Sequence, residues 1–320
     1  MKRKFHFEQS NGVEEADSDL YNHGVEWHRG SLIGKGGYGS VYIAELKNPN
    51  SRNEAFPELM TIKSAKVSAS SSLKKEKRVL DDLRGCPYII DCYGEETTTT
   101  KKGKMIYNLL LEYASEGTLD SLIKQSGGCG LHESDVRRYT RCILKGIDYI
   151  HSRGYVHCDL NPANVLLVSD ENWETFVPKI GDFGLAKRLV KSKQMEFYSS
   201  LEGTLRYMAP ETIIDEIQEY PCDIWALGCI VLEMLTGKKV WIGMEIDEIF
   251  AKISYLYQFP NIPPQISEEA KDFLKGCFVR NPMLRFSAGL LLIHPFVYDD
   301  EIRENSDEER VKFLLILGKC

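Results

Sequence analysis

A loop-like segment at residues 157–167 carries a carboxylate and an amide at a spacing that suits phosphoryl chemistry. Its sequence is His-Cys-Asp-Leu-Asn-Pro-Ala-Asn-Val-Leu-Leu, which places Asp159 and Asn164 five residues apart. Pro162 between them disfavours a continuous helix. In a loop, the carboxylate can accept the proton of a substrate hydroxyl while the amide oxygen binds Mg²⁺. The segment therefore predicts a catalytic loop.

A second carboxylate, Asp182, follows a strand-like run at residues 179–180 and begins an Asp-Phe-Gly triplet. Mg²⁺ is a hard cation that takes oxygen ligands and bridges phosphates, so Asp182 is a candidate ligand. An ordinary turn is the alternative, because Asp and Gly are both common in turns.

Three glycines, Gly34, Gly36 and Gly39, match the pattern Gly-x-Gly-x-x-Gly. A dinucleotide-binding fold requires a helix after these glycines. Residues 40–46 are instead β-branched and alternating, which predicts a hairpin. A glycine-lined hairpin can lie over a nucleotide triphosphate, because backbone N–H groups then approach the phosphate oxygens. A purely structural turn is the alternative.

Lys63 lies at the end of a strand-like run, residues 59–63, and Glu76 lies in the charged helical stretch 73–83. A lysine in a strand is usually exposed to solvent. Glu76 can nevertheless reach back toward Lys63, and such a pair would hold the ammonium group against the α- and β-phosphates of ATP.

The elements that must position these groups change in kind along the chain. Strand-like segments dominate residues 27–107, whereas apolar residues recur at helical spacing over 136–152 and 222–235. A strand-rich first part and a helix-rich second part indicate two lobes of an α+β protein. The 320 residues are 43% hydrophobic and 27% charged, which excludes a largely disordered chain, a collagen-like repeat and a coiled coil.

Charge and cysteine usage exclude several classes of partner. The net charge of −7 argues against nucleic acid, since that binding depends on Lys and Arg that neutralise phosphates, and the basic run 74–78 indicates a solvated helix face. No run approaches the ~20 apolar residues of a membrane span. The nine cysteines are scattered without metal or redox spacing, so we expect reduced thiols in a cytoplasmic or nuclear protein that neither inserts into membranes nor binds nucleic acid.

Taken in order, these segments resemble the signature set of eukaryotic protein kinases. The resemblance extends over residues 27 to about 297. Its later motifs are Ala209-Pro210-Glu211, residues 223–228, residues 280–285 and residues 294–296. It implies a bilobal α+β protein-kinase fold. The implied domains are a flexible acidic leader at 1–25, a β-rich N-lobe at about 26–112, a helical C-lobe at about 113–297, and a short tail at 298–320.

The resemblance also implies roles for individual residues, with ATP and Mg²⁺ as cofactors. The catalytic residues would be Asp159 as base, Lys63 and Asn161; the Mg²⁺ ligands would be Asn164 and Asp182. The nucleotide-binding residues would be Ile33, Gly34, Gly36, Gly39, Val41, Lys63, Glu76, Glu112, Ala114 and Leu166, with Leu111 as gatekeeper. Glu211 and Arg285 resemble a buried ion pair that anchors the activation segment.

Residues 203–211, Gly-Thr-Leu-Arg-Tyr-Met-Ala-Pro-Glu, are similar to the pattern of Ser/Thr kinases. With the loop at 157–164 and the short layout, the chain resembles plant mitogen-activated protein kinase (MAPK) kinase kinases of the MEKK-like subgroup. The resemblance implies transfer of the ATP γ-phosphoryl group to Ser or Thr of a protein substrate, a MAPK kinase. We expect a monomer or transient complexes.

Three positions depart from the family pattern. Cys158 replaces an Arg that pairs with a phosphorylated activation loop, so we expect phosphorylation of Ser192, Ser199 or Ser200 not to act as a simple switch through this residue. Asn161 replaces a Lys that contacts the γ-phosphate, which predicts a lower kcat. Thr61 replaces an Ala that roofs the adenine, which predicts weaker ATP binding. The last two departures leave open a weakly active or inactive scaffold or regulator.

Overall fold

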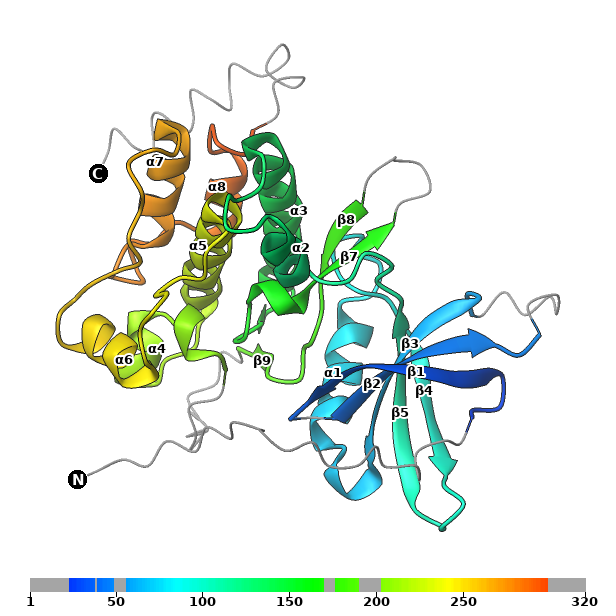
Figure 1. Cartoon of the computed structure of the whole chain (residues 1–320). Helices are drawn as coiled ribbons and strands as arrows, with labels where there is room; N and C mark the ends of the chain where they lie inside the picture. Colours follow the sequence, from blue (N-terminus) through cyan, green and yellow to red (C-terminus); the bar gives the residue numbers. More distant parts are fainter. Residues whose placement is uncertain (1–22, 38, 49–55, 170–175, 190–202, 299–320) are drawn as a thin grey trace.

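The computed structural model describes residues 23–37, 39–48, 56–169, 176–189 and 203–298. A sheet with one long helix forms one lobe, and helices form the other (Figure 1). The bilobal α+β fold expected from the sequence is therefore confirmed.

The first lobe is an antiparallel sheet, which within the described residues has five strands in the order β1-β2-β3-β5-β4. The strands are β1 (Trp27–Gly36), β2 (Gly39–Leu46), β3 (Leu59–Lys66), β4 (Cys92–Thr99) and β5 (Met105–Glu112). A short 3₁₀ turn, η2 (Val67–Ala69), leads from β3 into α1 (Ser71–Asp82). On α1, Leu73 and Leu80 face the interior together with Glu76, while the basic residues of 74–78 lie on its more exposed side. This agrees with the solvated face expected there.

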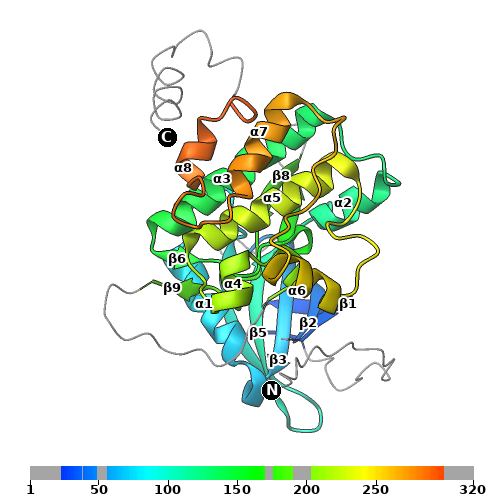
Figure 2. The ribbon, with the colours of Figure 1, turned by 90° about the vertical axis from the view of Figure 1, so that its left-hand side faces the viewer.

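The second lobe is built around two helices, α3 (Glu133–Ser152) and α5 (Tyr220–Thr236), which run beside each other (Figure 2). Helix α3 has one apolar face, whereas α5 is buried on nearly all sides and therefore lacks a polar face. The lobe also contains the helices α2 (Leu119–Gln125), α4 (Pro210–Asp215), α6 (Ile246–Ser254), α7 (Glu268–Cys277) and α8 (Ala288–Leu292) and the 3₁₀ helix η4 (Leu205–Tyr207).

Two short strand pairs carry the loops that matter for chemistry. Strand β6 (Tyr155–Val156) pairs with β9 (Lys187–Arg188), and β7 (Val165–Ser169) pairs with β8 (Phe176–Ile180). Residues 157–164 lie between β6 and β7, and Asp182 follows β8. The pairing of β7 with β8 therefore brings the two predicted carboxylate segments to the same end of a hairpin.

The lobes are joined by backbone hydrogen bonds as well as by the chain. Ile90 N donates to Ile180 O at 3.0 Å, and Ile180 N donates to Tyr88 O at 2.8 Å. These bonds attach the segment before β4 to strand β8 of the other lobe.

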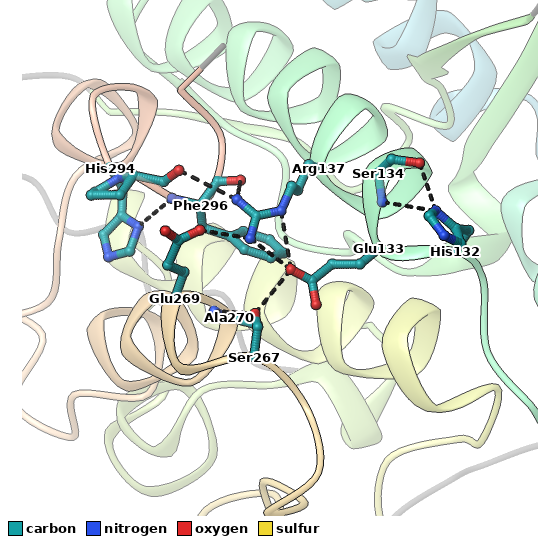
Figure 3. Close-up of polar contacts among 10 residues, drawn as sticks. His132, Glu133, Ser134, Arg137, Ser267, Glu269, Ala270, His294 and Phe296 are labelled. Atoms are coloured by element: carbon teal, nitrogen blue, oxygen red, sulfur yellow. Dashed lines mark hydrogen bonds and ion pairs between the residues drawn. The ribbon is translucent and has the colours of Figure 1, made fainter. Parts of the chain in front are cut away.

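The far end of the helical lobe is tied together by Arg137 on α3 (Figure 3). Its guanidinium donates to Glu133 and Glu269, each at 2.6 Å, and to Phe296 O at 3.1 Å, and it lies 4.8 Å from the Phe296 ring centroid. Ser267, which caps α7, also donates to Glu133. The network thus joins α3, α7 and the segment 294–296 far from the predicted site.

In the described part of the chain, no helix is both long and apolar enough to span a membrane.

Candidate active site

A cavity of about 730 Å³ lies between the sheet and the helical lobe, within the size range of small-molecule sites. It is lined by every residue predicted to bind nucleotide, namely Ile33, Gly34, Gly36, Gly39, Val41, Lys63, Glu76, Glu112, Ala114 and Leu166. Asn164 and Asp182 also line it, whereas Asp159 lines a smaller neighbouring cavity with Thr204.

The glycines of the β1–β2 hairpin have different physical roles. Gly39 has φ +145°, and a Cβ there would lie 2.4 Å from Ser64 O, so the backbone itself requires glycine. A Cβ on Gly36 would meet nothing within 4 Å, and one on Gly34 would meet only Val41, at 3.8 Å. Packing therefore explains Gly39 alone. The missing side chains of Gly34 and Gly36 leave open space at the cavity, as backbone contact with phosphate requires.

Lys63 links three elements at the inner end of the cavity. Its Nζ lies 2.8 Å from Glu76 Oε2 on α1 and 2.8 Å from Asp182 Oδ1 after β8. Burial alone would lower the pKa of Lys63, but the two carboxylates outweigh it and raise that pKa. Lys63 therefore stays charged, as an electrostatic contact with phosphate requires.

The two carboxyl groups beside Lys63 respond differently. Burial raises the pKa of Glu76 to about 6, although Lys63 opposes the shift. Asp182 is more exposed, and Lys63 lowers its pKa despite partial burial. Asp182 is therefore the more firmly ionised of the two.

Asp159 is held by Thr204, in the run 203–211. Its Oδ1 accepts from the Thr204 N–H and from the Thr204 hydroxyl, both at 2.9 Å. Burial raises the pKa of Asp159, against the effect of the Thr204 hydrogen bonds. A carboxylate with a raised pKa is a better proton acceptor, so the setting suits a general base.

The donor set fits a Mg²⁺ ion shared with phosphates. Asn164 Nδ2 donates to Asp159 O at 2.9 Å and to Asp159 Oδ2 at 3.2 Å, which commits the NH₂ end of the amide. Among the described residues, Asn164 Oδ1 and Asp182 Oδ2 have no protein hydrogen-bond donor. Over the same residues, no group of three or more His, Cys, Asp or Glu could hold a metal. Mg²⁺ typically takes one or two protein ligands and completes its shell with phosphates and water.

At the outer end of the cavity, the segment 112–114 presents backbone groups that can bind a ligand. The Glu112 carboxylate accepts from Lys179 Nζ at 2.7 Å and from Asp91 N at 3.1 Å, so it ties the lobes together instead of facing a ligand. Among the described residues, the Ala114 N–H has no acceptor and can bind an adenine edge. Thr61 lies opposite Leu111 in the β3–β5 register, and both line the cavity.

Two of the departures from the family pattern lie in the catalytic loop. Asn161 is buried, and its side chain serves a local turn: Nδ2 donates to Asp159 O at 3.0 Å, and Oδ1 accepts from Ala163 N at 3.0 Å. It thereby caps the 3₁₀ helix η3 (Pro162–Asn164), where the sequence predicted only a loop. Each polar atom makes one hydrogen bond within that turn, and neither bonds to Thr204. Cys158 is buried with φ +70°, in the left-handed region.

Asp223 supports the catalytic loop, a role that the sequence reasoning did not identify. Its carboxylate accepts from His157 N at 2.9 Å and Cys158 N at 3.1 Å, and lies 2.9 Å from His151 Nε2. Asp223 is one of two carboxylates buried in the mainly apolar helix α5, the other being Glu233. A carboxylate within an apolar helix was the available signal, because a buried charge needs partners.

Glu211 and Arg285 form the buried pair that the resemblance implied. The guanidinium of Arg285 donates to both Glu211 oxygens, at 2.6 and 2.9 Å, and also to Pro221 O and Val279 O. The three serines of the predicted activation loop, Ser192, Ser199 and Ser200, lie outside the described residues.

Comparison with known proteins points in the same direction as the geometry. The family model "Protein kinase domain" matches residues 27–297. Mitogen-activated protein kinase kinase kinase 20 of Arabidopsis thaliana is 43% identical over 309 residues, which are 92% of this chain and 86% of that protein. Mitogen-activated protein kinase kinase kinase 17 of the same plant is 39% identical over 277 residues, covering 85% and 70% of the two chains. These matches confirm the resemblance that the ordered motifs predict.

Proposed function

Because the chain belongs to the protein kinase domain family, we propose that it is a serine/threonine kinase that transfers the γ-phosphoryl group of ATP to a MAPK kinase. The observation that carries the proposal is the joint placement of Lys63, Glu76 and Asp182 within 2.8 Å contacts at one end of a nucleotide-sized cavity. The names of the similar plant proteins support the choice of substrate.

The chemistry follows from what each side chain is free to do. Bound Mg²⁺ would neutralise charge on the phosphates, with Asn164 and Asp182 as its protein ligands. Lys63 would hold the α- and β-phosphates while Glu76 fixes its position. Gly34 and Gly36, which lack side chains, would let the backbone of the β1–β2 hairpin approach the phosphates. Asp159, oriented by Thr204, would accept the proton of the Ser or Thr hydroxyl.

The cellular location, the partners and the oligomeric state are proposed on the same basis. The scattered cysteines and the acidic net charge support a cytoplasmic or nuclear kinase without a nucleic-acid partner. Single transfers to a protein substrate need only transient complexes, so a monomer suffices.

A transfer assay on the full chain tests the proposal. Wild type is incubated with Mg²⁺, γ-labelled ATP and a MAPK kinase whose own activity has been removed by mutation, beside Lys63→Met and the surface control Lys124→Met. Wild type and the control should label Ser or Thr, and Lys63→Met should lose on the order of 10²–10³ of the rate, as for one strong stabilising donor. Labelling confined to Tyr would contradict the proposal.

The second candidate function is a scaffold or regulator with a kinase fold. It is favoured by Asn161, a neutral side chain that hydrogen-bonds within a local turn and supplies no cation at this position. Wild-type transfer no faster than that of Lys63→Met, with ATP still bound, would favour the scaffold.

A further inference from the structure

Two cysteine thiols lie together directly behind the catalytic carboxylate. Cys158 precedes Asp159 in the catalytic loop, and Cys222 lies in the first turn of α5. A single oxygen, Asp223 Oδ1, accepts from Cys158 N at 3.1 Å and lies 3.9 Å from Cys222 Sγ. Both cysteines line the small cavity that also contains Asp159 and Thr204. The shared Asp223 oxygen and the shared cavity place the two cysteines beside each other, and the Cys158 thiol together with burial raises the pKa of the Cys222 thiol.

We propose that Cys158 and Cys222 are a redox modification site: a hydroperoxide converts them to a disulfide, and the disulfide switches off phosphoryl transfer. The loss of transfer rests on the proposed kinase function. The disulfide itself does not.

The oxidation proceeds in two balanced steps. The Cys158 sulfur attacks one oxygen of a hydroperoxide, the O–O bond breaks, and Cys158 becomes a sulfenic acid while the hydroperoxide is reduced to an alcohol or, for hydrogen peroxide, to water. The Cys222 sulfur then attacks the Cys158 sulfur, and the sulfenic OH leaves with the thiol proton as water. The neighbouring Cys158 thiol and burial raise the pKa of the Cys222 thiol, so Cys222 stays protonated and is the poorer first nucleophile, which leaves Cys158 as the sulfur that meets the peroxide.

The pair Cys158 and Cys222 differs in solvent access from a second buried cysteine pair in the same lobe, Cys229 and Cys277. Cys158 and Cys222 each keep 8% of their surface exposed, and their cavity offers about 10 Å³ to a water-sized molecule, roughly the room one water needs. Cys229 and Cys277 are also close enough to influence each other, but both are 0% exposed. Of the two pairs, only Cys158 and Cys222 line a cavity and keep any exposed surface, so we expect hydrogen peroxide, the smallest hydroperoxide, to oxidise them in preference to the sealed pair.

The position of the bond explains why it would stop transfer. Both cysteines are free in the structure, so a disulfide, with an S–S length of about 2.05 Å, must draw the two sulfurs together. Cys158 has a constrained backbone with φ +70°, and its N–H is held by Asp223. Its movement is transmitted to Asp159, whose two 2.9 Å contacts with Thr204 set the orientation of the carboxylate. A displacement of about 1 Å in a reacting group can cost on the order of 10² in rate.

The decisive experiment maps disulfides in the wild-type full chain after treatment with hydrogen peroxide. Peptide mass spectrometry without reduction should find the 158–222 cross-link, and treatment with a dithiol reductant should remove it. Absence of this cross-link, or cross-linking of Cys229 to Cys277 instead, overturns the proposal whatever the kinase activity proves to be.

Activity is then measured on the same samples, each relative to its own untreated rate. Oxidised wild type should lose on the order of 10² in kcat, with ATP binding unchanged, and should recover on reduction. Cys222→Ala should resist peroxide, whereas Cys129→Ala, which removes an exposed thiol, should behave as wild type. A cross-link that leaves kcat intact refutes the switch but keeps the modification site. A chain that has no transfer activity even when reduced refutes the proposed function instead.

Discussion

The Lys63 cluster and the Glu211–Arg285 pair are both buried salt bridges in the same chain, yet they differ in how completely their charges are matched. Arg285 is fully buried, pairs with both oxygens of one carboxylate and uses its other donors on backbone carbonyls. Lys63 instead contacts two carboxylates, and the Asp182 side chain is 36% exposed at the cavity. Within the described residues, the first site is neutral and closed, whereas the second carries excess negative charge and is open.

The difference indicates what each site is for. A closed and fully hydrogen-bonded pair has no remaining capacity to bind a ligand, so its contribution is to hold α4 against the segment 280–285. An acid-rich site with free carboxylate oxygens attracts a divalent cation. The two carboxylates also fix the position of the Lys63 ammonium group, which can then contact the phosphates of ATP.

The largest expected difference is in stability. Arg285→Met leaves Glu211 buried without its partner and should cost about 3–5 kcal/mol in the free energy of unfolding. Lys63→Met should cost less than half as much, because burial already raises the pKa of Glu76 to about 6 and the unpaired Glu76 can take up a proton. Urea unfolding of the three proteins at pH 7 measures both values. Equal losses would show that the two pairs do not differ in this way.

Added positive charge at the site of Lys63 and Asp159 should raise kcat. Asn161→Lys supplies a cation near Asp159 and should raise kcat, with an upper bound on the order of the 10²–10³ attributed to one stabilising donor. The variant should also lose about 1 kcal/mol of stability, because Asn161 caps η3. Steady-state kinetics and urea unfolding give the two values. Asn161→Ala is the matched control, since it removes the cap without adding charge. A lysine variant no faster than wild type would contradict the expectation.

Acid should weaken the Lys63 cluster. Glu76 has a pKa of about 6 in the folded protein, so it becomes neutral as the pH falls below that value and no longer holds Lys63. We expect kcat/KM to fall up to about tenfold per pH unit below pH 6, an acid limb that Glu76→Gln should lack. The effect on stability has the opposite sign: the ordinary pKa is 4.5, so between about pH 4.5 and 6 the folded chain binds more protons and its free energy of unfolding rises as the pH falls. An acid limb retained in Glu76→Gln would assign it to another group.

The smallest expected effect concerns the roof of the cavity. Thr61→Ala removes a methyl and a hydroxyl that face the adenine region and should tighten ATP binding by about 1 kcal/mol, a several-fold fall in Kd. Titration calorimetry with Mg–ATP measures the change, with the exposed β4 variant Thr97→Ala as control. Unchanged or weaker binding would show that Thr61 does not crowd the nucleotide.

Local patterns were sufficient for several elements, whereas the roles of most site residues came from the resemblance to protein kinases. The alternation after Gly39 predicted a strand, and the structure has β2 there. The helical spacing over 136–152 and 222–235 agrees with α3 and α5, whose ends lie within three residues of those limits. These features depend on neighbours in sequence, so a sequence pattern can contain them.

Contacts between distant segments were harder to predict. Nothing near Asp223 indicates that its carboxylate binds the loop 66 residues earlier, and nothing near Arg137 indicates its partners on α7 and at 295–296. The sequence predicted a catalytic role for Asn161 but not the hydrogen bonds of its side chain within the turn, because these depend on the φ and ψ values of that turn.

The sequence by itself determined the order of the motifs, the α+β class and the residue types able to bind phosphate and Mg²⁺, because each is expressed over a few consecutive positions. Only the tertiary structure decided which carboxylate oxygens stay free, which salt bridge is closed, and that Cys158 and Cys222, 64 residues apart in sequence, line one cavity. Unpaired hydrogen-bond acceptors, burial and proximity are properties of side chains brought together by packing. They arise only when the whole chain has folded.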